Sequence, residues 1–156
     1  VAPEKFEKVQ LPHLEEGFRR AGGGKDISRF AVLPGVSVVV NDDLEKARMA
    51  VKPGMALYIG GMGARGKNFY NDHAKRLGYE EAAVRIQDLF LGGKKAEAVA
   101  AVPDALVDEV ALVGPKARIR ERLSAWREAG KKGFVHTMQL GTSQPEALEL
   151  LAEEML

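Results

Sequence analysis

The chain has 156 residues, 29% charged and 46% apolar, and its 23 lysines and arginines nearly balance 22 aspartates and glutamates. This length suits one domain with a substantial core, and the net charge of +1 provides no field to hold nucleic acid or an anionic membrane. The absence of cysteine excludes disulfides, thiolate metal sites and a cysteine nucleophile. No apolar run reaches the roughly 20 residues that span a bilayer, and no signal-peptide pattern opens the chain. We therefore expect a cytoplasmic protein without nucleic-acid or membrane partners.

The first part of the chain is predicted to contain helices around one buried strand. Residues 3–21 are helical in two parts, with Pro12 as the boundary, and three consecutive glycines then stop the helix. Residues 30–40 form a strand, because the β-branched run at its centre suits a strand covered on both faces. Asn41-Asp42-Asp43 offers N-cap oxygens to the next helix, which Pro53 is expected to break or kink.

The rest of the chain is predicted to be mostly helical, with one more strand. Apolar residues recur at helical spacing over 68–90, interrupted at Gly78-Tyr79, and two shorter helices follow at 94–101 and 104–110. Val113-Gly114-Pro115 is expected to open a helix with a buried stripe and a glycine cap. The stripe residues are Ile119, Leu123 and Trp126, and the cap is Gly130. Residues 134–140 alternate as a strand does, and Ser143 with Glu146 predicts a capping box for a last helix.

This order predicts an α/β fold in a single segment. Its parts are a helix at 1–24, a strand at 30–40, a helical excursion at 41–112 and a helix-strand-helix unit at 113–156. Two strands cannot make a parallel sheet covered on both faces, and a (β/α)8 barrel needs eight strands and about 250 residues. We therefore expect a slice of a larger fold. The first residue is Val1, so the chain is either processed or a piece of something longer.

The stretch "GGMGARGKN" (60–68) fits two nucleotide-binding patterns incompletely. It matches the dinucleotide fingerprint, but no strand ending in an acidic residue follows about 20 residues later. It matches the phosphate loop except at Asn68, where that motif needs a hydroxyl to hold Mg²⁺. A plain glycine-rich turn with solvated Arg65 and Lys67 explains the same letters. Free amides beside two cations could still hold a phosphate without either framework.

At this stretch the residues also resemble a known family. "ALYIGGMGARGKNFYND" is similar to the segment after the seventh strand of luciferase-like flavin and deazaflavin oxidoreductases, closest to the deazaflavin-dependent subset. "VSVVVNDDLEKAR" resembles that family's seventh strand and the helix after it, and "LVGPKARIRERLSAWREAGKKGFVHTMQLG" resembles its approach to the eighth. "PEKFEKVQLPHLEEGFRRAG" is similar to its sixth helix.

The resemblance implies the C-terminal segment of a (β/α)8 TIM barrel, with a long helical insertion between the last two strands. It implies hydride transfer between a deazaflavin, coenzyme F420, and a small organic substrate in a homo-oligomeric oxidoreductase. The remaining N-terminal part of the barrel would carry the catalytic residues, so the isolated chain is expected to be inactive. The cofactor-binding residues implied here are Gly60, Gly61, Gly63, Arg65 and Lys67. An FMN-dependent monooxygenase of the same family and a non-catalytic helical interaction module stay open as alternatives.

Other polar residues give weaker signals. The three histidines show no metal-ligand spacing: His13 is expected at the surface, His73 partly buried and His136 in a structural position. Gln139 and the turn at 141–143 are expected at the barrel's catalytic mouth, although capping alone explains Ser143. The run of four cations at 116–122 predicts a solvated helical face. The aromatic residues Tyr58, Phe69 and Tyr70 could line a pocket for a planar ring or simply pack the excursion.

Overall fold

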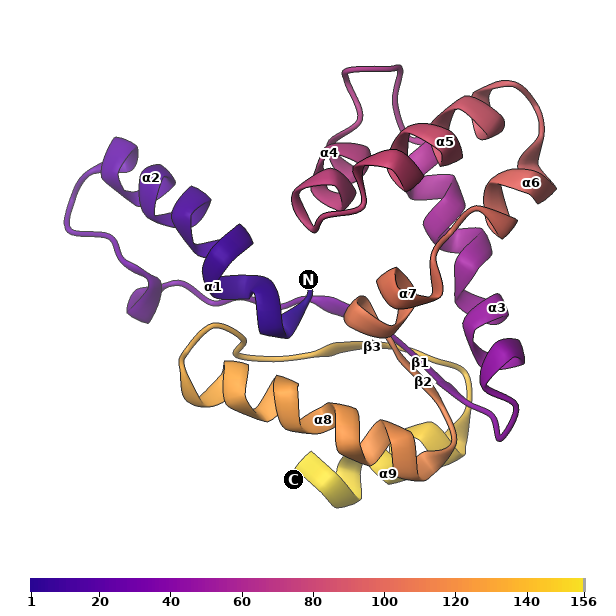
Figure 1. The fold of residues 1–156 in the computed structure, drawn as a ribbon. Coiled ribbons are helices and arrows are strands. Elements are labelled where there is room, and N and C mark those ends of the chain that lie inside the picture. Colours follow the sequence, from indigo (N-terminus) through magenta and orange to yellow (C-terminus); the bar gives the residue numbers. More distant parts are fainter. Residues whose placement is uncertain (156) are drawn as a thin grey trace.

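Helices cover both faces of a small parallel sheet in the computed structural model, which describes residues 1–155 (Figure 1). The α-helices are α1 (Phe6–Val9), α2 (Leu11–Ala21), α3 (Leu44–Ala56), α4 (Phe69–Arg76), α5 (Glu80–Leu91), α6 (Lys95–Ala100), α7 (Asp104–Val110), α8 (Lys116–Lys131) and α9 (Pro145–Met155). Two 3-10 turns, η1 (Pro3–Lys5) and η2 (Ile27–Arg29), and a π-helical segment, η3 (Leu57–Gly61), complete the helical part. Over the described range, no helix combines the length and the apolar character that crossing a bilayer requires.

The sheet is built on β1 (Gly35–Val40), which lies between β2 (Leu112–Gly114) and β3 (Gln139–Gly141). Both neighbours run parallel to β1, but they pair with different halves of it. β3 pairs with residues 35–37, and β2 pairs with residues 38–40. The helical excursion therefore leaves β1 at its carboxyl end and returns beside that same end.

The sequence-based strand predictions are confirmed in part. Both predicted strands are shorter than expected, since β1 begins at Gly35 instead of residue 30 and the last strand does not fill 134–140. The parallel relation between the two is as expected. Phe134 instead stacks on Phe6 of α1, with ring centroids 5.0 Å apart, and Val135 is buried. The apolar alternation there reflects packing against helices rather than strand pairing. The sequence does not predict β2, because three residues give no periodic signal; its residues fall at the end of the predicted excursion and at the start of the predicted helix.

A glycine makes the turn from β2 into α8. Gly114 has a φ of +114°, a conformation that L side chains rarely adopt, and a Cβ there would lie 3.0 Å from side-chain atoms of Leu44 and Arg118. Pro115 is the N-cap of α8, so the helix begins one residue later than predicted. At its other end α8 runs past Gly130 to Lys131.

Two apolar cores lie on opposite faces of the sheet. One face, with Val36, Val38 and Leu112, packs against α8 and α9, including the predicted stripe of Ile119, Leu123 and Trp126. On the other face, Val39 and Val113 pack against α3 and α7, and the core continues into α5 and α6. Alternate β1 residues thus serve different cores, since successive side chains of a strand point to opposite faces.

The helix after β1 continues through its proline. Asp43 caps α3 as expected, its Oδ1 accepting a hydrogen bond from the Lys46 amide at 3.2 Å. The predicted break at Pro53 is wrong, because α3 extends to Ala56 and the winding changes only at Leu57. Buried Lys52 and Ala56 hold this last turn against the rest of the helical layer.

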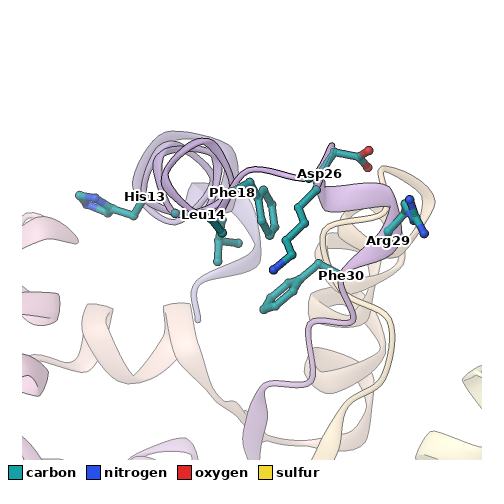
Figure 2. Close-up of a pocket in the computed structure, with 10 residues that line it drawn as sticks. His13, Leu14, Phe18, Asp26, Arg29 and Phe30 are labelled. Carbon is teal, nitrogen blue, oxygen red and sulfur yellow. The ribbon is translucent and has the colours of Figure 1, made fainter.

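Helix α2 forms an arm that stands away from the sheet (Figure 1). The helical stretch is divided at Gln10 rather than Pro12, and α2 has no buried residue. Phe18 of α2 meets Phe30 edge to face, with ring centroids 5.3 Å apart, and both residues line an open cavity between α2 and η2 (Figure 2). Phe30 and Leu33 remain 44% and 46% exposed. The apolar face of this arm is therefore largely uncovered within residues 1–155.

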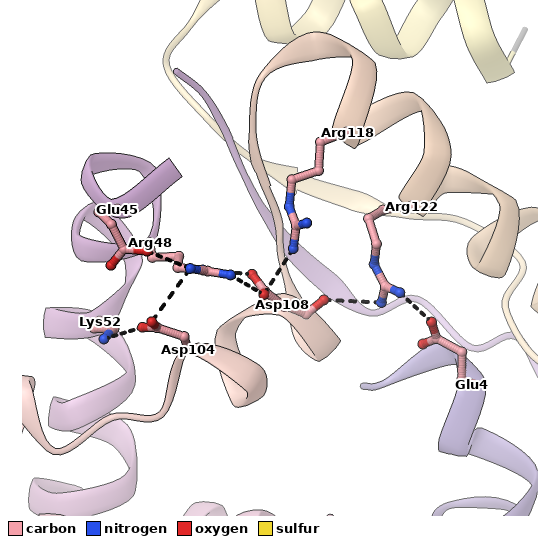
Figure 3. A network of polar contacts seen from close by, with 8 residues as sticks. All are labelled: Glu4, Glu45, Arg48, Lys52, Asp104, Asp108, Arg118 and Arg122. Atoms are coloured by element: carbon pink, nitrogen blue, oxygen red, sulfur yellow. Dashed lines mark hydrogen bonds and ion pairs between the residues drawn. The ribbon is translucent and has the colours of Figure 1, made fainter. Parts of the chain in front are cut away.

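One carboxylate joins the helical layers on the two faces of the sheet (Figure 3). Asp108 of α7 accepts two hydrogen bonds from Arg48 of α3, at 3.1 and 2.6 Å, and pairs with Arg118 of α8 at 2.9 Å. Arg122 of α8 donates to the Asp108 carbonyl and pairs with Glu4 at 2.7 Å. The predicted solvated basic face is therefore wrong for Arg118 and Arg122, because both reach back to the α7 layer.

Replacing Asp108 with Asn tests this junction. The pKa of Asp108 is pushed up by burial, but hydrogen bonds from Arg48 and the charge of Arg118 outweigh this and hold it below its ordinary value. Its charged form therefore stabilises the fold above the unfolded pKa of about 4, and this contribution is lost as the pH falls further. We expect Asp108→Asn to lower the free energy of unfolding by about 1.5–3 kcal/mol at neutral pH, measured by urea denaturation.

A matched control uses the exposed partner of the same arginine. Glu45 pairs with Arg48 at 2.6 Å, but its side chain is 71% exposed. We expect Glu45→Gln to change the free energy of unfolding by less than about 0.5 kcal/mol. Equal effects of the two substitutions would contradict a special role for Asp108.

Tyr79 gives a second, alkaline test. Its hydroxyl donates to Glu109 at 2.9 Å, and Glu109 also pairs with Lys5 at 2.7 Å. Burial, followed by the Glu109 hydrogen bond, raises the pKa of Tyr79 to about 12. A raised folded-state pKa favours the neutral phenol in the fold, so its contribution is present below the unfolded pKa of about 10 and disappears as the pH rises towards 12. The stability difference between wild type and Tyr79→Phe, from urea unfolding, should shrink across this range; a constant difference would contradict the assignment.

Candidate functional site

The glycine stretch lies on the helical excursion, away from the carboxyl ends of the strands (Figure 1). α3 begins just after β1 ends, and its 13 residues carry the chain roughly 20 Å before η3 starts. Residues 62–68 then form an open loop between η3 and α4. In a barrel of parallel strands, functional sites lie at the carboxyl ends of the strands. The position of this loop, at the far end of α3, therefore does not by itself identify it as such a site.

Two of the glycines are needed for close packing against α5. A Cβ at Gly60 would lie 2.6 Å from Cβ of Phe90, and one at Gly61 would lie 2.4 Å from a ring carbon of the same residue. Phe90 thus occupies the space that side chains of η3 would need. Gly63 is closed in by the loop itself, since its Cβ would lie 2.5 Å from the Lys67 carbonyl oxygen. These three glycines have a structural reason in the packing of η3 and its loop.

Asn68 explains why the stretch departs from the phosphate-loop pattern. It is the N-cap of α4, where its Oδ1 accepts hydrogen bonds from the amides of Tyr70 and Asn71. Its Nδ2 donates to the carbonyls of Tyr58 and Ile59, each at 3.0 Å. A serine could supply the cap but not the donation to the π-helical carbonyls. The buried amide thus serves both the end of one helix and the start of the next.

Two more buried amides complete this polar arrangement. Asn71 Nδ2 donates to the carbonyls of Ile59 and Ala83, and Gln87 Nε2 donates to the Gly63 carbonyl at 3.2 Å. Asn71 is 2% exposed and Gln87 6%. These side chains thereby bond to backbone carbonyls of η3, of the loop after it and of α5, and their own buried polar groups are satisfied.

The two cations of the loop remain at the surface. Arg65 Nε lies 2.8 Å from Asp88 Oδ1, but both side chains are more than half exposed, so the pair contributes little to stability. Lys67 is exposed, and its amide closes a turn on the Ala64 carbonyl at 2.9 Å. Both ammonium and guanidinium groups are therefore open to an anion from solvent. Of the five predicted cofactor residues, Gly60 and Gly61 thus lie in η3, where Gly60 is buried, and Gly63, Arg65 and Lys67 lie in the loop that follows.

The carboxyl edge of the sheet is organised by Gln144, not by Gln139. The register places Gln139 opposite Gly35, at the beginning of β1, so its predicted position at the catalytic mouth is wrong. The Gln144 side chain instead accepts from the Val40 amide at 2.7 Å and donates to the Val40 carbonyl at 2.9 Å. At the turn before α9, Thr142 Oγ1 accepts from the Gln144 amide. The side-chain amide of Gln144 continues the β1–β3 pairing beyond the last residue of β3.

The histidines occupy the kinds of position that the sequence predicted. His13 is exposed and His73 is half-buried. His136 lies at the surface and holds the backbone of Val32, with Nδ1 accepting from the Val32 amide at 3.2 Å. Among the residues that the structure describes, no group of three acidic, histidine or cysteine side chains is placed to hold a metal ion.

The aromatic residues beside the glycine loop divide into two kinds. Tyr58 and Tyr70 meet edge to face, with ring centroids 4.7 Å apart, and both line a cavity that faces β1. Phe69 lies against Tyr70 but is 67% exposed and does not line that cavity. Ser37 and His73 also line it, and the sequence did not group them with the tyrosines. The one available signal was Ser37 itself, a polar residue in a run of valines.

Comparison with known proteins identifies relatives over most of the chain. The model of the "Luciferase-like monooxygenase" family matches residues 1–132. A protein of Mycobacterium tuberculosis, provisionally named a coenzyme F420-dependent oxidoreductase, is 38% identical over 124 residues. This alignment covers 80% of the present chain and 36% of that protein.

A solved structure is similar in fold. The coenzyme F420-dependent tetrahydromethanopterin reductase of Methanopyrus kandleri superposes with a TM-score of 0.64 and 23% sequence identity. The match covers 97% of this chain and 41% of the reductase. The chain therefore spans only about two-fifths or less of the relatives it matches.

Substituting Asn68 tests the double role of its amide. We expect Asn68→Ser to keep the cap of α4 but leave the two carbonyls of η3 without their donor. The free energy of unfolding should fall by about 1–3 kcal/mol, measured by thermal or urea denaturation. Thr142→Val is a control, because it removes one hydroxyl hydrogen bond at a less buried turn and should cost less. A stable Asn68→Ser variant would show that the loop does not need this amide.

Proposed function

The chain belongs to the luciferase-like monooxygenase family, and from this premise we propose that it is the C-terminal part of an oxidoreductase that uses coenzyme F420. The reaction would be hydride transfer between this deazaflavin and a small organic substrate. The observation that carries the proposal is the 38% identity to a mycobacterial protein provisionally named for this cofactor. The fold shared with an F420-dependent reductase agrees with it.

The open surfaces of the structure support a larger barrel. On the side of β2, residues 35–37 of β1 have no strand partner in the described part of the chain, and β3 pairs on only one side. The apolar face of the α2 arm, with Phe30 and Leu33, is also uncovered. In our proposal the N-terminal part of a (β/α)8 barrel covers these surfaces and carries the catalytic residues. The isolated 156-residue chain would then turn over no substrate.

The loop after η3 is the part of this chain that we propose contacts the cofactor. Gly60 and Gly61 let η3 pack on Phe90, and Gly63 closes the loop, so the loop backbone is held in one shape. Arg65 and Lys67 are exposed on it and would balance an anionic cofactor tail. A closely packed backbone with exposed cations at its surface suits an extended, negatively charged ligand.

The test removes the two cations from the complete protein that contains this segment. We expect the double variant Arg65→Ala/Lys67→Ala to bind the deazaflavin at least about twofold more weakly, since exposed ionic contacts are worth roughly 0.2–1 kcal/mol each and shielded ones more. Its salt dependence should also be flatter. Affinity is measured by titrating the cofactor's fluorescence at several ionic strengths.

A charge-matched control is available on the α2 arm. Lys25→Ala/Arg29→Ala removes two exposed cations far along the chain from the loop, and it should leave the affinity unchanged. If both double variants bind equally well, the loop only turns the chain. If the complete protein binds FMN and not the deazaflavin, the cofactor assignment itself is wrong.

A further inference from the structure

A tight turn fixes the backbone of Arg65. The Lys67 amide donates to the Ala64 carbonyl at 2.9 Å, which closes a turn over residues 64–67. Gly66 takes the third position with a φ of +74°, a conformation that glycine adopts without strain. Arg65 occupies the second position, and its side chain is 63% exposed. The turn therefore holds the backbone, whereas the long side chain keeps many rotamers unless another group orders it.

Helix α5 supplies such a group from a well-packed segment. Gln87 is 6% exposed and donates to the Gly63 carbonyl at 3.2 Å, and Phe90 packs against the glycines of η3. Asp88 lies between these two residues of α5, and its side chain is 53% exposed. Its carboxylate is therefore attached to a part of the helix that already packs on the loop.

A single hydrogen bond joins the two side chains. Arg65 Nε donates to Asp88 Oδ1 at 2.8 Å, and within residues 1–155 no hydrogen bond engages Nη1 or Nη2 of Arg65. The guanidinium is planar and its donors have fixed directions, so a bond at Nε also orients the two terminal nitrogens. The edge between Nη1 and Nη2 therefore points away from Asp88, and both nitrogens are free to donate parallel hydrogen bonds to one oxyanion.

Asp88 has two opposite effects on an anion at this edge. As the partner in an exposed ion pair, it favours the paired rotamer of Arg65 by about 1.5- to 5-fold, and a side chain that is already ordered loses less freedom on binding. As a negative charge it repels the same anion, but the guanidinium lies between them and salt screens exposed charges over about 8 Å. Orientation should therefore outweigh repulsion at physiological ionic strength.

We infer that Asp88 is a positioning residue of the proposed cofactor loop. It orients Arg65 so that Nη1 and Nη2 together bind one oxyanion of the cofactor tail. Lys67 contributes charge without direction, because an ammonium group is a compact charge with rotatable donors. The inference rests on the proposed function and assigns different roles to the two cations of the loop.

The test compares Asp88→Ala with Asp88→Asn in the complete protein that contains this segment. Both substitutions remove the same charge, but only asparagine keeps an oxygen that accepts from Arg65 Nε. The deazaflavin, titrated by its fluorescence, should bind about two- to fivefold more weakly to Asp88→Ala than to Asp88→Asn. This ratio should stay nearly constant as the ionic strength rises, because the two variants carry the same net charge.

Two further comparisons separate orientation from charge. In an Arg65→Ala background the two Asp88 variants should bind the deazaflavin equally, since no guanidinium is left to orient. Arg65→Lys should lose more affinity than Lys67→Arg, because an ammonium group cannot present two parallel donors in a fixed plane.

Glu81 provides the matched control, because it is an exposed carboxylate in the first turn of the same helix. Glu81→Ala and Glu81→Gln should have the same Kd for the deazaflavin. Circular dichroism verifies that each variant is folded, and the comparison of Arg65→Lys with Lys67→Arg decides the matter if Asp88→Ala is unstable.

Two results would overturn the inference: equal binding by Asp88→Ala and Asp88→Asn, or a difference between them that persists without Arg65. If Arg65→Ala/Lys67→Ala binds as tightly as wild type, the proposed loop contact fails and the role of Asp88 fails with it. If that double variant binds more weakly while the two Asp88 variants bind equally, only the role of Asp88 is wrong.

Discussion

Strand β1 pairs in parallel with two other strands, one along each half of its length, and this pairing determines how the rest of the chain is arranged. Parallel neighbours need crossover connections, so the chain must leave the carboxyl end of β1 and travel back before each return. The first return uses the whole excursion from α3 to α7, and the second uses α8. Because β1 side chains alternate between faces, each crossover receives its own core. Asp108 then links the two helical layers through arginines from α3 and α8.

The glycine loop shows how one stretch can satisfy a recognition pattern and a packing requirement together. Phe90 excludes side chains at Gly60 and Gly61, and the amides of Asn68, Asn71 and Gln87 satisfy the carbonyls around η3. π-helical segments are frequent at functional sites, and here the irregular winding presents a fixed loop with two exposed cations. Packing explains why the glycines are needed. The two cations, in contrast, make no buried contact that would explain them structurally.

The same excursion also separates two kinds of surface. Its loop exposes positive charge to solvent, whereas the side of η3 and α4 that faces β1 presents tyrosines and a neutral histidine to a cavity.

The sequence by itself determined the features that depend on neighbours in the chain. Helical periodicity, the Asp43 cap, the valine-rich strand and the stripe of α8 are encoded locally, and the family resemblance followed from contiguous motifs. Only the tertiary structure decided features that join distant residues. It paired Gln139 with Gly35 and bonded the last residue of β1, Val40, to the side chain of Gln144. It also formed β2 from three residues that show no periodic pattern in the sequence. It also turned Arg118 and Arg122 towards Asp108, because register and ion pairing depend on partners far away in the sequence.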